Sequence, residues 1–486
     1  MDPSPSTVGC FGGMFKRRKH RRDKKPLPTS AEKTVTVNSV SEHSGATVGQ
    51  HQCSYFSPAC NFAYGNAKDA WREIEVPPSY TATELSSMSP EVLQTVETTL
   101  DGLNASLREL SLEIHSHPEI MFEERHTHDL LTAFMSTHGF KVTRHYLGLE
   151  TAWRAEFTNG SGGRVLGINS EMDALRGIGH ACGHNLIAIS GVGVAIAVKK
   201  ALETHNVPGK VVLLGTPAEE GGAGKAILLE RGGYADMDAC IMCHPGPGLP
   251  RSISVGTTIA MQEIEIEYYG HSAHAGAAPW EGTNALDAAF LAYSGISVLR
   301  QQMKPDHRIH GIVLGKDWSS NVIPDYAKML WGVRAPNWNE LQAFVKRAIA
   351  CFEGAALATS CTLKIKADLP YFDLHQNHIL ADAFADIVGQ RYGVLTTTTD
   401  STASTDFGNI SYALPSLHPV FAIPTQPNGG NHTPAFAAAA ATEQAHAATI
   451  MVSKGLALTG FKILEDAIFF KEVRGAFDTW KEGSSE

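Results

Sequence analysis

Apolar residues recur at helical intervals in the segment that follows residue 89, as they do on the buried face of an amphipathic helix. They are Leu93, Val96, Leu100, Leu103, Leu107, Leu110 and Ile114. Ser89 is a suitable N-cap for this helix, and Pro90 is suited to its first turn. The pattern predicts that ordered structure begins with a helix near Ser89.

Short apolar runs then alternate with helical patterns up to about residue 255. Strands are predicted at 165–168, 211–215 and 240–243, and helices at 187–203 and 224–231. This alternation is typical of an α/β domain with a mostly parallel sheet and helices on both faces.

The pattern changes near residue 256. Residues 263–268 alternate strictly between charged and apolar, which predicts a half-exposed antiparallel strand. Further strands are expected at 309–314, 327–333 and 362–367, with helices at 285–300 and 340–353. This β-α-β-β-α-β order predicts a ferredoxin-like α+β domain over 256–370. It would interrupt a catalytic α/β domain made of 89–255 and 371–486, and act as a lid or dimerisation domain.

Residues 1–88 differ from the rest of the chain. They are rich in Ser, Thr, Pro and charge, and residues 16–22 read KRRKHRR. Like charges this close repel one another, so we expect a disordered tail. A nuclear address or a patch for anionic lipid is the alternative reading of the basic run.

Composition narrows the class of protein. The net charge of −10 argues against a nucleic-acid-binding protein. No apolar stretch is long enough to span a membrane, and the N-terminus lacks the apolar region of a signal peptide. The eight cysteines in 486 residues do not indicate a disulfide scaffold. We therefore expect a cytoplasmic enzyme, while the basic run leaves nuclear or membrane-surface targeting open.

Candidate metal ligands follow the predicted strands. Cys182 and His184 flank a glycine in the loop after the first strand, and a thiolate and an imidazole both suit zinc or another transition metal. Glu219 and Glu220 follow the second strand, His244 follows the third, and His432 lies in a glycine-rich loop before a helix. Ligands bind at the carboxyl ends of strands in such sheets, so we expect these side chains to converge. Of two adjacent carboxylates, one can bind metal while the other acts as general base.

Several motifs in the same order resemble the peptidase family M-20, and in particular its amidohydrolase and aminoacylase-like dipeptidase branch. The resemblance covers about residues 90–460. Its motifs are HSHPEIMFEE (115–124), EMDAL (171–175), GHACGHN (179–185), TPAEEGGAGK (216–225), HPG (244–246), GHSAHAGAAP (270–279), NVIP (321–324), STDFGN (404–409) and NHTP (431–434).

The resemblance implies a dinuclear metal site. It implies two divalent ions, zinc first, with manganese or cobalt as alternatives, and Glu219 as the general base. The implied ligands are Cys182, His184, Glu220, His244 and His432.

The resemblance also implies residues that contact the substrate. His274 would contact the substrate or its oxyanion, often across a dimer, whereas Asn321 and Arg334 would hold the substrate's carboxylate. We therefore expect a homodimer formed through the small domain.

The chain departs from the family at one motif. Many members carry H-x-D where this chain has Glu171-Met-Asp173. In this branch the histidine of the C-G-H motif, here His184, is the metal ligand instead. Asp173 is therefore expected to orient the ligands rather than bind metal.

These features predict a metal-dependent hydrolase that cleaves an amide bond in a dipeptide or N-acyl amino acid. Three alternatives stay open: amide tailoring in a specialised pathway by the same metal site, a non-catalytic binding protein with this fold, and an adaptor whose function lies in the basic tail. The presence of Glu219 together with every implied ligand argues against a relic site.

Overall fold

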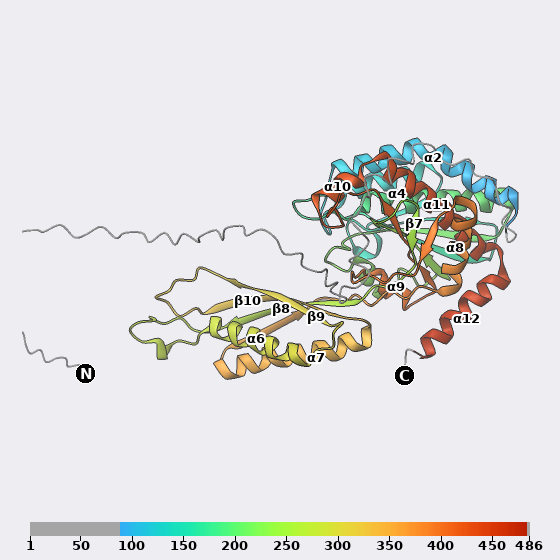
Figure 1. Ribbon diagram of the computed structural model, residues 1–486. Helices are drawn as coiled ribbons and strands as arrows, with labels where there is room; N and C mark the ends of the chain where they lie inside the picture. The colour runs from blue at the N-terminus through green and yellow to red at the C-terminus, as the bar shows by residue number, and fades with distance from the viewer. Residues whose placement is uncertain (1–87, 484–486) are drawn as a thin grey trace, which may run out of the picture. The chain divides into compact units, whose positions relative to one another are not determined.

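The computed structural model describes residues 88–483, and the basic run and the rest of the predicted tail lie outside these residues (Figure 1). Ordered structure begins with helix α2 (Pro90–Ser116), which the Ser89 side chain caps by accepting a hydrogen bond from the Val92 amide at 3.3 Å. Helix α3 (Arg125–Thr137) follows. The predicted first helix and its N-cap are therefore confirmed.

A six-stranded sheet forms the centre of the larger domain, with the strand order β1-β2-β4-β3-β5-β13. The pairs from β4 to β13 are parallel, whereas β1 and β2 add an antiparallel edge, so the sheet is mostly parallel as predicted. The strands are β1 (Lys141–Arg144), β2 (Trp153–Asn159), β3 (Arg164–Glu171), β4 (Gly209–Thr216), β5 (Ala239–Ile241) and β13 (Ser416–Leu417).

Helix α4 (His184–His205) lies against this sheet and is buried along most of its length. It packs on β3 and is covered by α2 and by α11 (Glu443–Glu465). By length and composition, α4 and α11 alone among the described helices are apolar enough to cross a membrane, but 89% and 72% of their apolar windows are buried inside the protein. Their hydrophobicity is therefore that of core helices.

The remaining helices and a second sheet complete the larger domain. This second sheet was not predicted, because its strands are only three or four residues long. Its order is β12 (Leu395–Thr397), β7 (Ser252–Ser254), β14 (Val420–Ile423) and β6 (His244–Pro247). The other helices are α5 (Gly224–Glu230), α8 (His378–Tyr392), α9 (Phe407–Ser411), α10 (Pro434–Ala440) and α12 (Ala467–Gly483).

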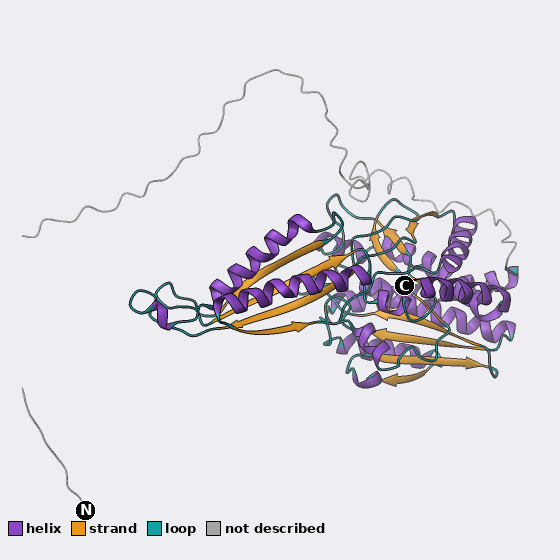
Figure 2. Ribbon diagram, turned by 90° about the horizontal axis from the view of Figure 1, so that it is seen from below, coloured by secondary structure: helices purple, strands orange, loops and turns teal. Residues whose placement is uncertain are grey.

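The inserted segment forms a four-stranded antiparallel sheet in the order β11-β8-β10-β9. Helices α6 and α7 lie side by side on one face of this sheet and enclose a hydrophobic core of their own (Figures 1 and 2). This order and the β-α-β-β-α-β connectivity are those of the predicted ferredoxin-like unit. The elements are β8 (Ala260–Tyr269), α6 (Ala285–Leu299), β9 (Arg308–Gly315), β10 (Tyr326–Ala335), α7 (Trp338–Thr359) and β11 (Thr362–Ala367).

The two ends of the inserted segment are paired with each other. Met261 and Tyr371 exchange both backbone hydrogen bonds, at 2.9 and 2.8 Å. The chain therefore enters and leaves the small domain at one place.

Gly191 sets the distance between α4 and β3. A Cβ at this position would overlap Ser170 Oγ and lie 2.8 Å from the Asn169 carbonyl oxygen. We predict that Gly191→Ala lowers the free energy of unfolding by about 1–3 kcal/mol, the usual cost of overpacking a core. Gly102→Ala is the control, because nothing lies within 4 Å of a Cβ there, and removing a helical glycine should stabilise by about 0.5–1 kcal/mol. Urea unfolding of both variants tests this, and equal stabilities would contradict it.

Candidate metal centre and active site

The loops at one edge of the sheets gather the predicted metal ligands. Glu219 and Glu220 follow β4, Cys182 precedes α4, and His184 is the first residue of that helix. His244 begins β6. The His432 amide donates a 2.8 Å hydrogen bond to the Ala181 carbonyl, which ties the loop before α10 to the Cys182 segment. The structure thus brings all the predicted ligands into one site.

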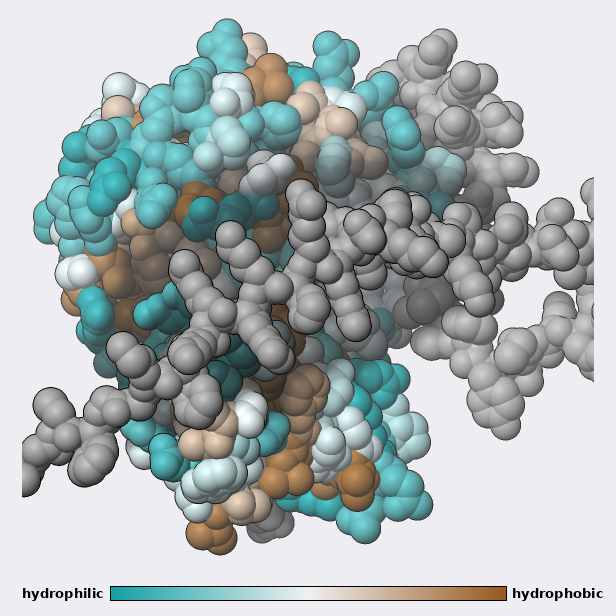
Figure 3. Space-filling view, turned by 90° about the vertical axis from the view of Figure 1, so that its left-hand side faces the viewer, coloured by the Kyte–Doolittle hydropathy of each residue, from teal (hydrophilic) through white to brown (hydrophobic). Residues whose placement is uncertain are grey.

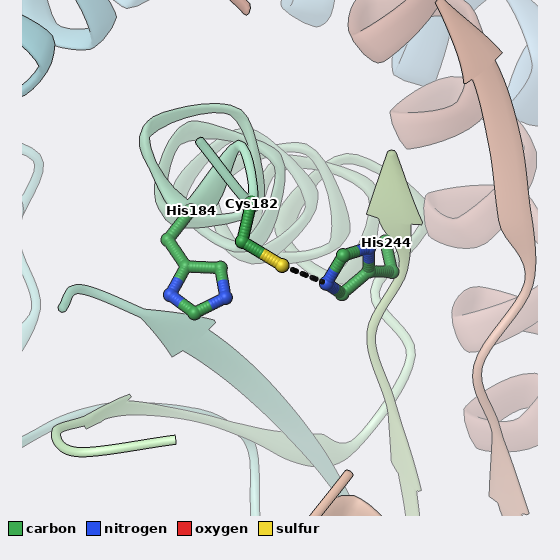
Figure 4. A group of neighbouring side chains, drawn as sticks. All are labelled: Cys182, His184 and His244. Atoms are coloured by element: carbon green, nitrogen blue, oxygen red, sulfur yellow. Dashed lines mark hydrogen bonds between the residues drawn. The ribbon is translucent and has the colours of Figure 1, made fainter. Parts of the chain in front are cut away.

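The predicted ligands fall into two groups that share a cysteine. Cys182 Sγ lies 3.4 Å from His244 Nε2, with His184 beside them (Figure 4). These three side chains place their ligand atoms within 4.8 Å of one another, and so do Cys182, Glu220 and His432. Within the second group, His432 Nε2 and Glu220 Oε2 are 3.3 Å apart.

Two histidines of the first group have their Nδ1 atoms committed to backbone oxygens. His184 Nδ1 lies 2.8 Å from the Asp173 carbonyl oxygen, and His244 Nδ1 lies 2.7 Å from that of Pro245. A carbonyl only accepts, so each Nδ1 carries a proton, and in the neutral ring each Nε2 keeps its lone pair. Such an arrangement fixes the tautomer and orientation that a metal ligand needs.

Asp173 holds the loop that carries the two glutamates. Its Oδ1 accepts a hydrogen bond from the Glu219 amide at 3.1 Å, and its Oδ2 accepts one from the Glu220 amide at 2.9 Å. The Tyr371 hydroxyl donates to the Glu219 carbonyl at 2.7 Å. These contacts fix where Glu219 and Glu220 lie, which is consistent with an orienting role for Asp173.

The site concentrates ionisable groups away from water. Burial, together with the charges of Glu171 and Glu220, holds the pKa of the Glu219 carboxyl well above its ordinary value. Burial also raises the pKa of the Cys182 thiol. Burial would raise the pKa of Glu220 as well, but His432 and His184 outweigh it and lower that pKa.

The residues present fit divalent cations. His184 Nε2 and Glu220 Oε1 are buried and lack a hydrogen-bond partner, although such atoms are nearly always satisfied in folded proteins. Sulfur, imidazole nitrogen and carboxylate oxygen together form a donor set that zinc and other transition metals accept.

The three predicted substrate contacts lie in the small domain. Arg334, at the end of β10, donates to Ser404 Oγ at 3.1 Å, and its charge acts on His432. His274 Nδ1 instead accepts from the amides of Gly276 and Ala277, at 3.1 and 3.2 Å.

Asn321 lies beside His274. Its carbonyl accepts from the Ala275 amide at 2.9 Å, and its side chain accepts from Ser319 Oγ. Among the hydrogen bonds of the described residues, none joins His274 or Asn321 to the ligands. The structure therefore brings these two residues together, but it connects only Arg334 to the larger domain's loops.

Three charged residues at the back of the site were not identified from the sequence. Lys225 is fully buried, 2.7 Å from Glu171 Oε1 and 2.6 Å from Asp406 Oδ1. Each belongs to a motif that carries the resemblance: EMDAL, TPAEEGGAGK or STDFGN. The sequence offered one signal, because Lys225 lies along the chain between the motifs that contain Glu171 and Asp406. It does not show that the three side chains meet.

Comparison with known proteins identifies the family. Residues 167–457 match the family described as Peptidase family M20/M25/M40. The chain is 38% identical over 418 residues to the Xaa-Arg dipeptidase of Mus musculus, a match that covers 82% of this chain and 94% of that protein. This chain belongs to peptidase family M20/M25/M40. The predicted family is confirmed, and the M20 chain is a hydrolase of amide or peptide bonds.

Other relatives agree with this assignment. The M20 chain is 39% identical over 399 residues to the Xaa-Arg dipeptidase of Homo sapiens, covering 78% of this chain and 90% of that protein. It is 30% identical over 313 residues to a p-aminobenzoyl-glutamate hydrolase chain of Escherichia coli, covering 60% of this chain and 64% of that one.

The fold also matches solved structures. A putative aminohydrolase from Staphylococcus aureus matches with a TM-score of 0.62 at 18% identity, over 76% of this chain and 98% of that one. A dinuclear metal-binding M20 peptidase from Bacillus subtilis matches with a TM-score of 0.57 at 23% identity, over 75% and 99% of the two chains. The predicted fold class is confirmed.

Glu124 supports the glutamate loop from behind and provides a test of the site's electrostatics. It is fully buried and accepts hydrogen bonds from the Ala218 amide at 2.9 Å, the Phe122 amide at 3.0 Å and the Thr151 hydroxyl at 2.6 Å. Burial, and then the charge of Asp173, raise the pKa of Glu124 to about 7.

We predict that Glu124 makes the protein less stable as pH rises through neutrality. Between the ordinary carboxyl pKa and about 7, the folded protein holds a proton that the unfolded chain releases, so the free energy of unfolding falls with rising pH, by up to about 3 kcal/mol in all. Glu124→Gln stays neutral and should lose this slope between about pH 4.5 and about pH 7, the window that the two pKa values set. Urea unfolding across that range is the measurement, and an identical slope in the variant would contradict the assignment.

Proposed function

We propose that this M20 chain hydrolyses the amide bond of a dipeptide or an N-acyl amino acid by using two divalent metal ions. The convergence of two ligand groups that share Cys182, directly beside Glu219, is the observation that carries the proposal. The names of the relatives, Xaa-Arg dipeptidase and p-aminobenzoyl-glutamate hydrolase, support this substrate class.

One ion would be held by Cys182, His184 and His244, and the other by Cys182, Glu220 and His432. Cys182 belongs to both groups. Zinc suits the thiolate and imidazoles best, and manganese or cobalt accept the same donors. When bound, such ions polarise the scissile carbonyl and acidify water.

Glu219 would act as the general base. Its Oε2 lies 3.8 Å from His184 Nε2, while Asp173 and Tyr371 fix its backbone. Its raised pKa suits a carboxylate that takes a proton from the attacking water and then returns it to the leaving nitrogen.

Arg334 and Asn321 would hold the substrate's carboxylate, for which a guanidinium group is well suited. Arg334 already contacts the STDFGN loop through Ser404. His274 would stabilise the developing oxyanion. Its exposure in the small domain is compatible with its being supplied by a second copy of the chain.

A homodimer through the small domain is part of the proposal. Helix α6 exposes Phe290 (60%) and Val298 (76%), and Ile312 is exposed (54%) on β9, one of the two edge strands of the sheet. Hydrophobic residues lie among polar ones at the surface (Figure 3). An exposed edge strand next to apolar side chains favours pairing with another chain.

We predict that Glu219→Ala strongly lowers turnover while the protein keeps its metal. Loss of a positioned general base should lower kcat by about 10²–10⁴-fold. The measurement is hydrolysis of a panel that begins with Xaa-Arg and Xaa-Lys dipeptides and includes N-acyl amino acids, with metal content determined on the same samples. Glu123→Ala, an exposed glutamate, is the control. A wild-type protein that neither binds zinc, manganese or cobalt nor turns over any of the panel would contradict the proposal.

The proposed homodimer can be tested by light scattering coupled to gel filtration. We expect the wild-type chain to elute as a dimer and Phe290→Glu/Val298→Glu as a monomer with reduced turnover, because charge on α6 would oppose the contact. Leu357→Glu introduces the same charge at an exposed leucine (85%) on α7 and should leave the dimer intact. A monomeric wild-type protein with full turnover would refute the dimer.

A further inference from the structure

Three charged side chains without solvent exposure lie behind the metal centre. Lys225 Nζ contacts Glu171 Oε1 at 2.7 Å and Asp406 Oδ1 at 2.6 Å, and the Lys225 amide donates to Asp406 Oδ2 at 2.8 Å. Charged side chains are almost never fully buried unless they are paired. Lys225 therefore fixes one oxygen of Glu171 and occupies both oxygens of Asp406.

The second oxygen of Glu171 is aimed at the metal centre. Glu171 Oε2 lies 3.3 Å from His184 Nε2, and neither atom has a hydrogen-bond partner although both are buried. Glu171, His184 and Glu219 also place their ligand atoms within 4.8 Å of one another.

A cation between Glu171 and His184 explains this contact. When the ring is neutral, as a metal ligand must be, His184 Nδ1 directs its proton toward the Asp173 carbonyl and Nε2 presents its lone pair to Glu171. Two acceptors that face each other without a hydrogen-bond donor repel, unless a cation lies between them. Their 3.3 Å separation also matches the distance of about 3.3 Å between neighbouring ligands on a tetrahedral ion with bonds of about 2.0–2.1 Å.

We propose that Glu171 is a further metal ligand, binding through Oε2 the same ion as His184, and that Lys225 and Asp406 are positioning residues that hold it there. The inference rests on the proposed dinuclear site and adds to the ligands named above. Because Lys225 occupies Oε1, Glu171 would bind through a single oxygen. Lys225 lies in α5, directly after the loop that carries Glu219 and Glu220. Its ammonium group therefore connects this part of the chain to Glu171 at the end of β3.

The test is cobalt substitution of the full-length protein. In the wild type, the visible d–d bands report coordination number, and the thiolate-to-cobalt band in the near ultraviolet reports Cys182. Glu171→Gln should keep the thiolate band, change the d–d bands and weaken binding of one ion at least about 10-fold by dialysis, the scale on which loss of supporting contacts is felt. Lys225→Met should shift the d–d bands as well, because it releases the Glu171 carboxylate.

Glu97→Gln is the control, since Glu97 is a carboxylate that is held by Arg391 and Tyr392 rather than by any residue of the site. It should leave the cobalt spectrum unchanged. If Glu171→Gln does not fold, Glu171→Asp is the second variant. It keeps a carboxylate to pair with Lys225, but its shorter side chain moves the other oxygen away from His184. The same spectral change is expected.

The wild type provides a check that needs no variant. In a crystal structure of the metal-loaded protein, Glu171 Oε2 should lie about 2.0–2.2 Å from an ion. An unaltered cobalt spectrum in a folded Glu171 variant, or an ion more than about 3 Å from Oε2, well beyond the length of a metal–carboxylate bond, would overturn the inference and leave the proposed function standing. A wild-type protein that binds no metal would instead refute the proposed function.

Discussion

The site depends on the repulsion between buried thiol and carboxyl groups, whose negative charges must be neutralised by cations or by protons. Cys182, Glu171, Glu219 and Glu220 direct sulfur or oxygen atoms toward a small volume from which water is largely excluded. Lys225 is the only buried ammonium group among the described residues, and its charge is shared between Glu171 and Asp406. Without further positive charge the groups must take up protons, as the raised pKa values of Glu219 and Cys182 indicate. The fold thus holds together side chains that would separate in water.

The backbone supplies the rigidity that this crowding requires. Parallel strands β3 and β4 end side by side, with Glu171 opposite Thr216 in register, so the two acidic segments leave the sheet next to each other. Asp173 then binds the amides that follow β4, and the carbonyl of the same residue fixes His184. One short segment after β3 therefore orients groups from two other loops. This arrangement explains why ligands distant in the chain meet in one place.

Sequence patterns predicted the elements with strong periodicity and the ligands that stand in recognisable motifs. Helix α2, strands β3 and β4, and the inserted β-α-β-β-α-β unit all have clear apolar repeats, and each is found close to its expected bounds. The second sheet was missed because strands such as β7 and β12 are too short to show a repeat. Lys225 and Asp406 were missed for another reason: burial and pairing over 181 positions of sequence separation are properties of the folded chain. A charged residue in a glycine-rich loop looks solvated until its partner is known.

The pairing of Met261 with Tyr371 closes the inserted domain on itself, and this has a consequence for biosynthesis. Strands β5 and β6 are made before the insertion, but their partners β13 and β14 are made after it. During translation the small domain therefore has all of its own strands while the larger domain still lacks part of both sheets. The loop that carries His432 is made later still, so the site is complete only after this loop has left the ribosome. A nascent chain that lacks His432 thus cannot form the complete set of predicted ligands.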